Sequence, residues 1–90
     1  MAGSHVSIRG LPEWLIRDYL TALGARSAVL PDAPRMQADG WTVSWSSRSI
    51  LMPGGAFSLT QFDIVFESAA PDLLASIKEA FLKKVQRGGG

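Results

Sequence analysis

Few residues of this chain could carry chemistry, and no catalytic motif connects them. Asp63 and Glu67 lie four residues apart, which places two carboxylates on the outward face of one predicted strand. They could act as an acid and a base, or hold a hard cation. A solvated strand face explains the same pair more simply, because carboxylates are usually exposed. The sequence therefore predicts no catalytic residue and no metal ligands.

A second polar group surrounds Arg48 and consists of Ser44, Ser46, Ser47 and Ser49. A nucleophilic serine needs an activating base, and no suitable histidine is present to supply it. A guanidinium can anchor an anionic ligand through strong charge-assisted hydrogen bonds. The simpler interpretation is a loop or edge-strand segment, where serine is common. Arg48 is therefore a candidate ligand or interface residue.

Residue types that often serve as metal ligands or nucleophiles are scarce. The only histidine, His5, falls in an N-terminal segment that we expect to be flexible. The absence of cysteine excludes disulfides, thiolate zinc sites and cysteine nucleophiles, and it fits a reducing compartment. No apolar run is long enough for a membrane helix, and no secretory signal is recognised. We expect a cytoplasmic chain without a cofactor.

The three tryptophans are the other candidate ligand or interface residues. Trp41 and Trp45 share one strand face with Val43. If that face meets the helices, both rings belong to the core, which we favour because buried aromatic side chains supply a large apolar area. If it lies outside, it is a recognition surface for a subunit, a ligand or stacked bases. Trp14, beside the apolar stripe of a predicted helix, is expected to be partly exposed.

The charge balance argues against two classes of partner. A net charge of +1 lacks the electrostatic signature of binding to nucleic acid or to an anionic membrane. The acidic stretch 61–67 also lacks the basic and aromatic pattern of RNA-recognition strands. We therefore predict no nucleic-acid partner and no membrane partner.

The elements that position these residues begin with a strand over residues 6–11 and a helix over residues 12–23. Pro12 suits the first helical position, and Gly24 suits the residue after the helix end. Residues 27–30 are a brief strand or an extended connection. A hairpin follows over residues 35–38 and 41–45, because Asp39-Gly40 favours a type I′ turn.

The second half is predicted from its apolar spacing. Pro53-Gly54-Gly55 forms a turn. Phe57 and Leu59 have the opposite parity to the later apolar residues, which indicates a bulge near residues 60–61 or a strand that begins at about residue 60. A helix opens at residue 71, and we expect the glycines at 88–90 to end it.

Together these elements predict an α+β fold. Two helices with one apolar stripe each need one apolar sheet face to cover. We expect a two-layer, plait-like sandwich with a mostly antiparallel sheet of three to five strands and two helices on one face. With 90 residues and 47% hydrophobic content, the chain fits a single domain, ordered over about residues 6–86, with a flexible glycine-rich tail.

Residues 39–43, residues 55–67 and the closing helix resemble a little-studied bacterial domain. That domain is attached behind the ubiquitin-like part of proteins related to the small subunit of molybdopterin synthase. The resemblance covers about residues 6–86 and implies a plait-like fold and a context in molybdenum-cofactor or sulfur-transfer biology. It supplies no site residues. The C-terminal Gly-Gly of ubiquitin-type sulfur carriers leaves a strand, whereas the glycines here follow a helix.

The leading hypothesis is a non-enzymatic accessory or protein-interaction domain that associates with itself or with another protein domain. A small domain with an apolar sheet surface gains stability when a second copy covers it. The alternative is a small-ligand-binding or regulatory module that uses the aromatic face, with Arg48 as anion anchor. An enzyme that uses carboxylates is third.

Overall fold

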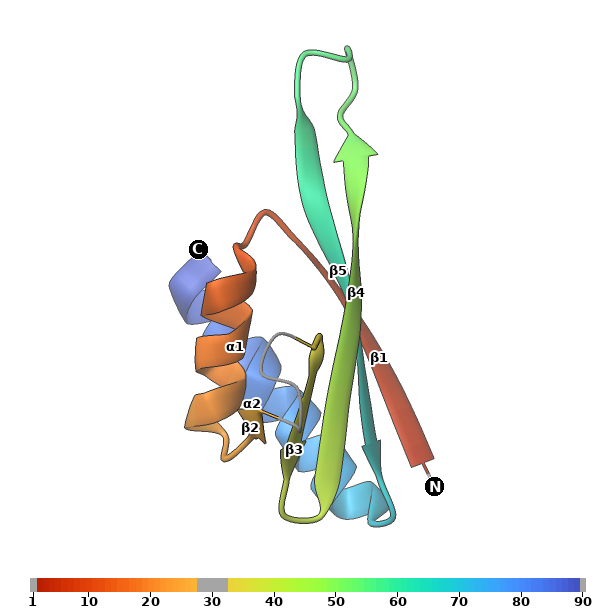
Figure 1. Ribbon diagram of the computed structural model, residues 1–90, viewed down its shortest axis with the longest axis vertical. Helices are drawn as coiled ribbons and strands as arrows, with labels where there is room; N and C mark the ends of the chain where they lie inside the picture. Colours follow the sequence, from red (N-terminus) through yellow and green to blue (C-terminus); the bar gives the residue numbers. More distant parts are fainter. Residues whose placement is uncertain (1, 28–32, 90) are drawn as a thin grey trace.

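The computed structural model describes residues 2–27 and 33–89. In chain order the elements are β1 (Ala2–Arg9), α1 (Glu13–Ala22), β2 (Arg26–Ser27), β3 (Arg35–Ala38), β4 (Trp41–Leu51), β5 (Ser58–Ser68) and α2 (Pro71–Gly89). The strands form an antiparallel five-stranded sheet in the order β1-β5-β4-β3-β2. Both helices lie on one face of the sheet (Figure 1). The predicted α+β two-layer fold is confirmed.

α2 begins at Pro71 as predicted, whereas α1 begins at Glu13, one residue after the predicted start, and α2 ends later than expected. Pro12 is the extended residue before α1, and Gly24 adopts a φ of 105° directly after the last turn. α2 continues through Gly88 and Gly89, so the prediction that the glycines would end it is wrong for these two residues. Each glycine costs a helix only about 1 kcal/mol relative to alanine, which a long preceding helix can tolerate.

β1 begins earlier than predicted, and this changes the place of the histidine. Every residue from Ala2 to Arg9 pairs with a residue of β5, and His5 lies opposite Val65. The expectation that His5 is flexible is therefore wrong, because the long β5 offers a partner to the whole N-terminal segment. The predicted brief strand at 27–30 is β2 as far as Ser27, and its remainder lies outside the described residues.

The hairpin between β3 and β4 forms where the sequence predicted it, with Ala38 opposite Trp41. Of the two turn residues, only Gly40 has a positive φ, at 85°. A type I′ turn needs positive φ at both central residues, so this prediction is wrong for Asp39. A Cβ atom added at Gly40 would lie 2.9 Å from Leu73 Cδ2, so glycine also provides room for α2.

β4 and β5 extend together beyond the other strands. Their register is unbroken from Thr42 opposite Glu67 to Leu51 opposite Ser58, so the predicted bulge is absent. We call residues 46–60 the arm; it rises above both helices in Figure 1, and the molecule is 43 Å long against 26 and 23 Å. Phe57 and Leu59 lie on the arm. Phe57 and Leu59 are odd-numbered, unlike the even-numbered core residues of β5, because the arm extends past the core and neither of its faces has to be apolar.

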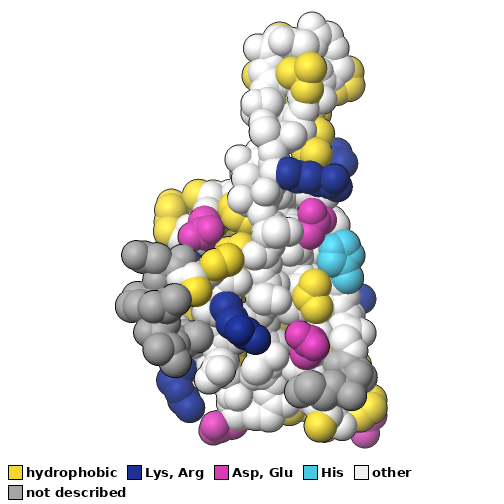
Figure 2. All heavy atoms as spheres, turned by 45° about the vertical axis from the view of Figure 1, so that its right-hand side comes forward, with side chains coloured by type: hydrophobic (Ala, Val, Ile, Leu, Met, Phe, Trp, Pro, Cys, Tyr) yellow, Lys and Arg dark blue, Asp and Glu magenta, His cyan; other side chains and the backbone are white. Residues whose placement is uncertain are grey.

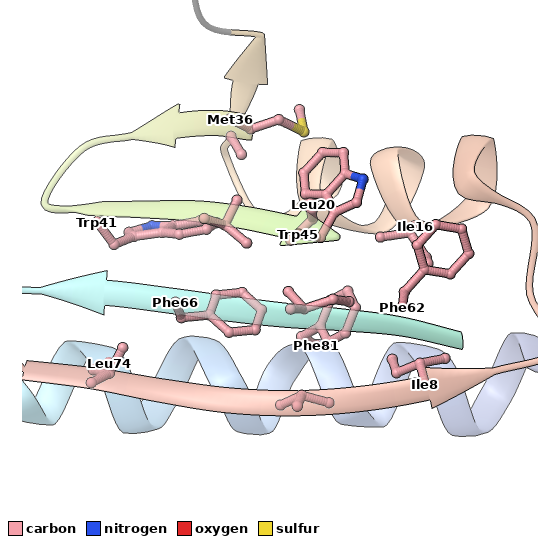
Figure 3. Close-up of a cluster of buried hydrophobic side chains, with 14 residues drawn as sticks. Ile8, Ile16, Leu20, Met36, Trp41, Trp45, Phe62, Phe66, Leu74 and Phe81 are labelled. Atoms are coloured by element: carbon pink, nitrogen blue, oxygen red, sulfur yellow. The ribbon is translucent and has the colours of Figure 1, made fainter. Parts of the chain in front are cut away.

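The core lies between the sheet and the two helices (Figure 3). Phe66 is its centre: its ring centroid lies 5.4 Å from that of Phe81 on α2 and 6.1 Å from that of Trp41. Trp41 and Trp45 are only 4% and 5% exposed. Of the two alternatives for their strand face, the structure selects the core. The buried hydrophobic residues are Val6, Ile8, Ile16, Leu20, Ala25, Met36, Trp41, Val43, Trp45, Phe62, Ile64, Phe66, Leu74 and Phe81.

Candidate functional site

The candidate site lies on the sheet face opposite the helices, which we call the open face. Residues of odd number on β1 and β5 and of even number on β4 point to this side, since their neighbours form the core. Cross-strand pairing places Gln61 between Arg9 and Arg48, and Asp63 between Ser7 and Ser46. Polar side chains from three strands are thus neighbours on one surface.

Asp63 is the centre of this group. Its Oδ1 accepts hydrogen bonds from Ser7 Oγ at 2.9 Å and from Gln61 Nε2 at 3.0 Å. His5 Nε2 lies 3.5 Å from Oδ1, and Arg48 Nε lies 3.6 Å from Oδ2. These five residues, together with Arg9, form what we call the open-face cluster.

Arg9 belongs to the cluster because it bonds to Gln61, whose side-chain amide is held in place by its own bond to Asp63. Arg9 Nε donates a hydrogen bond of 2.8 Å to Gln61 Oε1, while the amide nitrogen of Gln61 donates to Asp63. Gln61 is only 4% exposed although it lies on the open face, because its neighbours cover it. A buried amide that donates and accepts in this way holds the flanking side chains in one arrangement.

The hydrogen bonds at Asp63 also determine its charge state. Hydrogen bonds from Ser7 and from Gln61 lower the pKa of Asp63 below its usual value of 3.8. Partial burial opposes this effect, and the charges of Arg48 and of protonated His5 add to the lowering. Asp63 is therefore an ionised acceptor at neutral pH. A general acid would need the opposite shift of its pKa.

The surface beside Asp63 is shallow. A hollow of about 210 Å³ is lined by Ser44, Trp45, Ser46, Asp63 and Val65. Drug-sized ligands usually occupy pockets of about 300 to 1,000 Å³, so this hollow suits only a small group. The side chain of Arg48 is 64% exposed, and its guanidinium remains accessible next to the hollow. Figure 2 shows the histidine, acidic and basic side chains on this surface, with hydrophobic side chains at the tip of the arm.

The structure separates the four residues proposed from sequence. Arg48 belongs to the open-face cluster, whereas Trp41 and Trp45 point into the core on the other side of the sheet. Trp14 lies on α1 with 64% of its surface exposed, as expected for a residue beside the apolar stripe. The alternative, an aromatic ligand surface around Trp41 and Trp45, therefore does not form. Arg48 lies in an edge-strand segment, which was one of the two simpler interpretations.

Sequence reasoning missed most members of the cluster. Ser7, Arg9 and Gln61 alternate with core residues, which was the one available signal that they share a face. His5 was dismissed because its strand was predicted to begin after it. Among the described residues no group of three or more histidine, aspartate or glutamate side chains could hold a metal ion. The cluster can present hydrogen-bond donors and charges to a partner.

Comparison with known proteins places the chain in a family. Residues 4–90 match the family described as archaeal MoaD-like protein. The match covers nearly the whole chain, and the chain belongs to this family. No curated protein matches the sequence. In the described part of the chain, neither helix has the length and hydropathy needed to span a bilayer.

Proposed function

We propose that this chain is a non-enzymatic accessory domain that binds another protein through its open face, in molybdenum-cofactor or sulfur-transfer biology. The observation that carries the proposal is the sheet face without a helical layer, on which Arg48 and Asp63 are arranged in a fixed polar network. Membership of the MoaD-like family supports the biological context.

The chemistry of the cluster favours binding over catalysis. Asp63 already accepts two hydrogen bonds and has two basic neighbours, so it has little free capacity to accept a proton from a substrate. The hollow beside it is open to water, whereas a closed catalytic site expels water and thereby strengthens the electrostatic interactions inside it. By contrast, an exposed arginine beside an ordered polar surface is typical of the rim of a protein interface.

The order of elements favours an accessory role over that of the sulfur carrier itself. Ubiquitin-type carriers begin with two strands before their helix, whereas here α1 follows β1 directly. We propose that the chain is equivalent to the domain that follows the ubiquitin-like part in proteins related to the small subunit of molybdopterin synthase. Its partner would then be a ubiquitin-like sulfur carrier.

The test is a titration of the isotope-labelled chain with a purified archaeal small subunit of molybdopterin synthase, followed by amide chemical shifts. We expect saturable shifts at His5, Arg48 and Asp63. Arg48→Glu should weaken binding about tenfold, equivalent to 1.4 kcal/mol. The matched control is Lys83→Glu on α2, which changes the charge equally on the other side of the molecule. Shifts confined to the helices, or none, would contradict the proposal.

A second candidate function rests on the exposure of Arg48 beside the serine-lined hollow. A small anionic ligand could bind there, with the guanidinium as its anchor. The same labelled chain titrated with inorganic phosphate distinguishes the two functions. Saturable shifts at Ser44, Ser46 and Arg48 with phosphate, without shifts from the protein partner, would favour the ligand-binding module.

A further inference from the structure

The arm has a bare edge. Trp45 donates its backbone N–H to the Pro34 carbonyl at 3.0 Å, and beyond this point no described residue pairs with β4 on that side. On the other side, the Met52 N–H bonds to the Phe57 carbonyl at 3.1 Å. Because bonding directions alternate along a strand, even-numbered residues of β4 bond to β5 and odd-numbered ones point to the bare edge.

Three residues of the arm therefore direct backbone N–H and C=O groups outward: Ser47, Ser49 and Leu51. These are groups that an added strand would satisfy. A two-stranded ribbon is marginally stable by itself in water, so a third strand would also stabilise the arm.

The side chains of the arm do not protect this edge. Natural edge strands are usually guarded by lysine, proline or a bulge, whereas the arm has Arg48 as its one charged residue and has Pro53 only in the turn at its tip. Leu51 is 70% exposed and Phe57 60%. Of the two edge strands of the sheet, β1 carries the charged or titratable side chains of His5 and Arg9, and β2 is only two residues long. Pairing is therefore favoured at the arm.

We propose that the arms of two copies pair antiparallel along their β4 edges and form a homodimer around a two-fold axis at Ser49. In this register Ser49 pairs with Ser49 of the second copy, and Ser47 pairs with Leu51 in both directions. It is the only symmetric register that uses all three outward-pointing residues. Two-fold pairing of identical edges closes the assembly at two copies.

The charges agree with this register. A two-fold axis at Arg48 would place the two arginines directly opposite each other, and like charges opposite one another destabilise a sheet. With the axis at Ser49, Arg48 lies opposite Ile50 of the second copy, whose side chain can pack on the arginine's aliphatic stem. The same register directs each uncharged tip toward the start of β3 in the other copy, where Pro34 is exposed.

This dimer goes beyond the proposed binding of a partner at the open face, and it does not depend on that binding. It places the self-association that we expected from the sequence at the β4 edge of the arm.

The absence of native cysteine makes the register testable with single cysteines. Cα atoms of a hydrogen-bonded antiparallel pair lie about 5.5 Å apart, within disulfide range. Ser49→Cys should therefore form a disulfide-linked dimer on mild oxidation at micromolar concentration. Ser47→Cys is the matched control, because the two copies of residue 47 would be about 13 Å apart along the strand. Equal cross-linking of both variants, or none, would overturn the register.

Sedimentation of the chain without cysteines tests the dimer itself. Ser49→Pro removes an outward N–H without breaking a bond to β5, so it should convert a dimer into a folded monomer. Gly3→Pro makes the same change on the edge of β1 and should leave the dimer intact. A monomer at every concentration, or a dimer that only Gly3→Pro dissociates, would overturn the proposal. Loss of the dimer would leave the open-face titration unaffected, so the two proposals fail separately.

Discussion

The guanidinium carbon of Arg17 lies 4.9 Å from the centroid of the Trp45 ring, so α1 is joined to β4 by a cation–π contact. Glu13, one turn earlier on α1, bonds to both partners: its carboxylate oxygens accept from Arg17 Nε at 3.2 Å and from Trp45 Nε1 at 3.3 Å. Arg17 Nη2 also donates to the Ala33 carbonyl at 2.9 Å. One arginine thus connects a helix, a strand and the segment before β3.

We expect Arg17→Met to lower the free energy of unfolding by about 1 to 2 kcal/mol, since it removes the cation–π contact and the hydrogen bond to Ala33. Urea unfolding followed by tryptophan fluorescence measures the change. Arg26→Met is the control, because the side chain of Arg26 is 73% exposed and its ion pair is 3.9 Å long. Equal effects of the two variants would show that the Trp45 contact is not stabilising.

The tryptophans should differ sharply in their contribution to stability. Trp41→Ala opens a cavity beside Phe66 and should cost about 3 to 5 kcal/mol, enough to unfold a marginally stable domain. Trp14→Ala should change stability by no more than about 0.5 kcal/mol, because its side chain is exposed. Circular dichroism during urea unfolding compares the two variants. Comparable losses would mean that Trp14 is buried in solution, for example by a partner.

The stability of the chain should depend on the ionisation of Asp63. Its pKa is lower in the folded chain than the usual value of 3.8, so its contribution is fully present above the unfolded value and is lost as pH falls through the folded one. Asp63→Asn should therefore flatten the decrease of the urea midpoint below about pH 4. Glu67→Gln removes the same charge from the same strand. If both variants flatten the curve equally, total charge rather than the bonds to Ser7 and Gln61 determines it.

A buried serine should stabilise the connection between β5 and α2. Ser68 is 0% exposed; its Oγ donates to the Gly40 carbonyl at 2.6 Å and accepts from the Ala70 N–H at 3.0 Å. Ser68→Ala leaves both backbone groups without this partner and should cost about 1 to 3 kcal/mol. Thermal unfolding measures the loss, and Ser58→Ala on the exposed arm is the control. A loss no larger than that of Ser58→Ala would show that water replaces the hydroxyl.

Local patterns in the sequence determined the helices, most strand positions and which residues share one face of a strand or helix. Both α1 and α2 begin where proline and an acidic residue precede an apolar stripe, and alternation on β4 assigns Trp41, Val43 and Trp45 to one face. These signals depend on neighbours within a few positions, and they survive folding because the helical and strand periods are local properties of the backbone.

Only the tertiary structure decided which face is the core, which strands are neighbours and how far the arm projects. The bond between Ser7 and Asp63 joins residues 56 positions apart, and it exists because β1 pairs with β5 rather than with a nearer strand. The arm exists because β1 ends at Arg9, opposite Gln61, and β3 begins only at Arg35, opposite Ser44, while β4 and β5 continue. Strand order and relative strand length depend on the packing of the whole chain, so no local pattern encodes them.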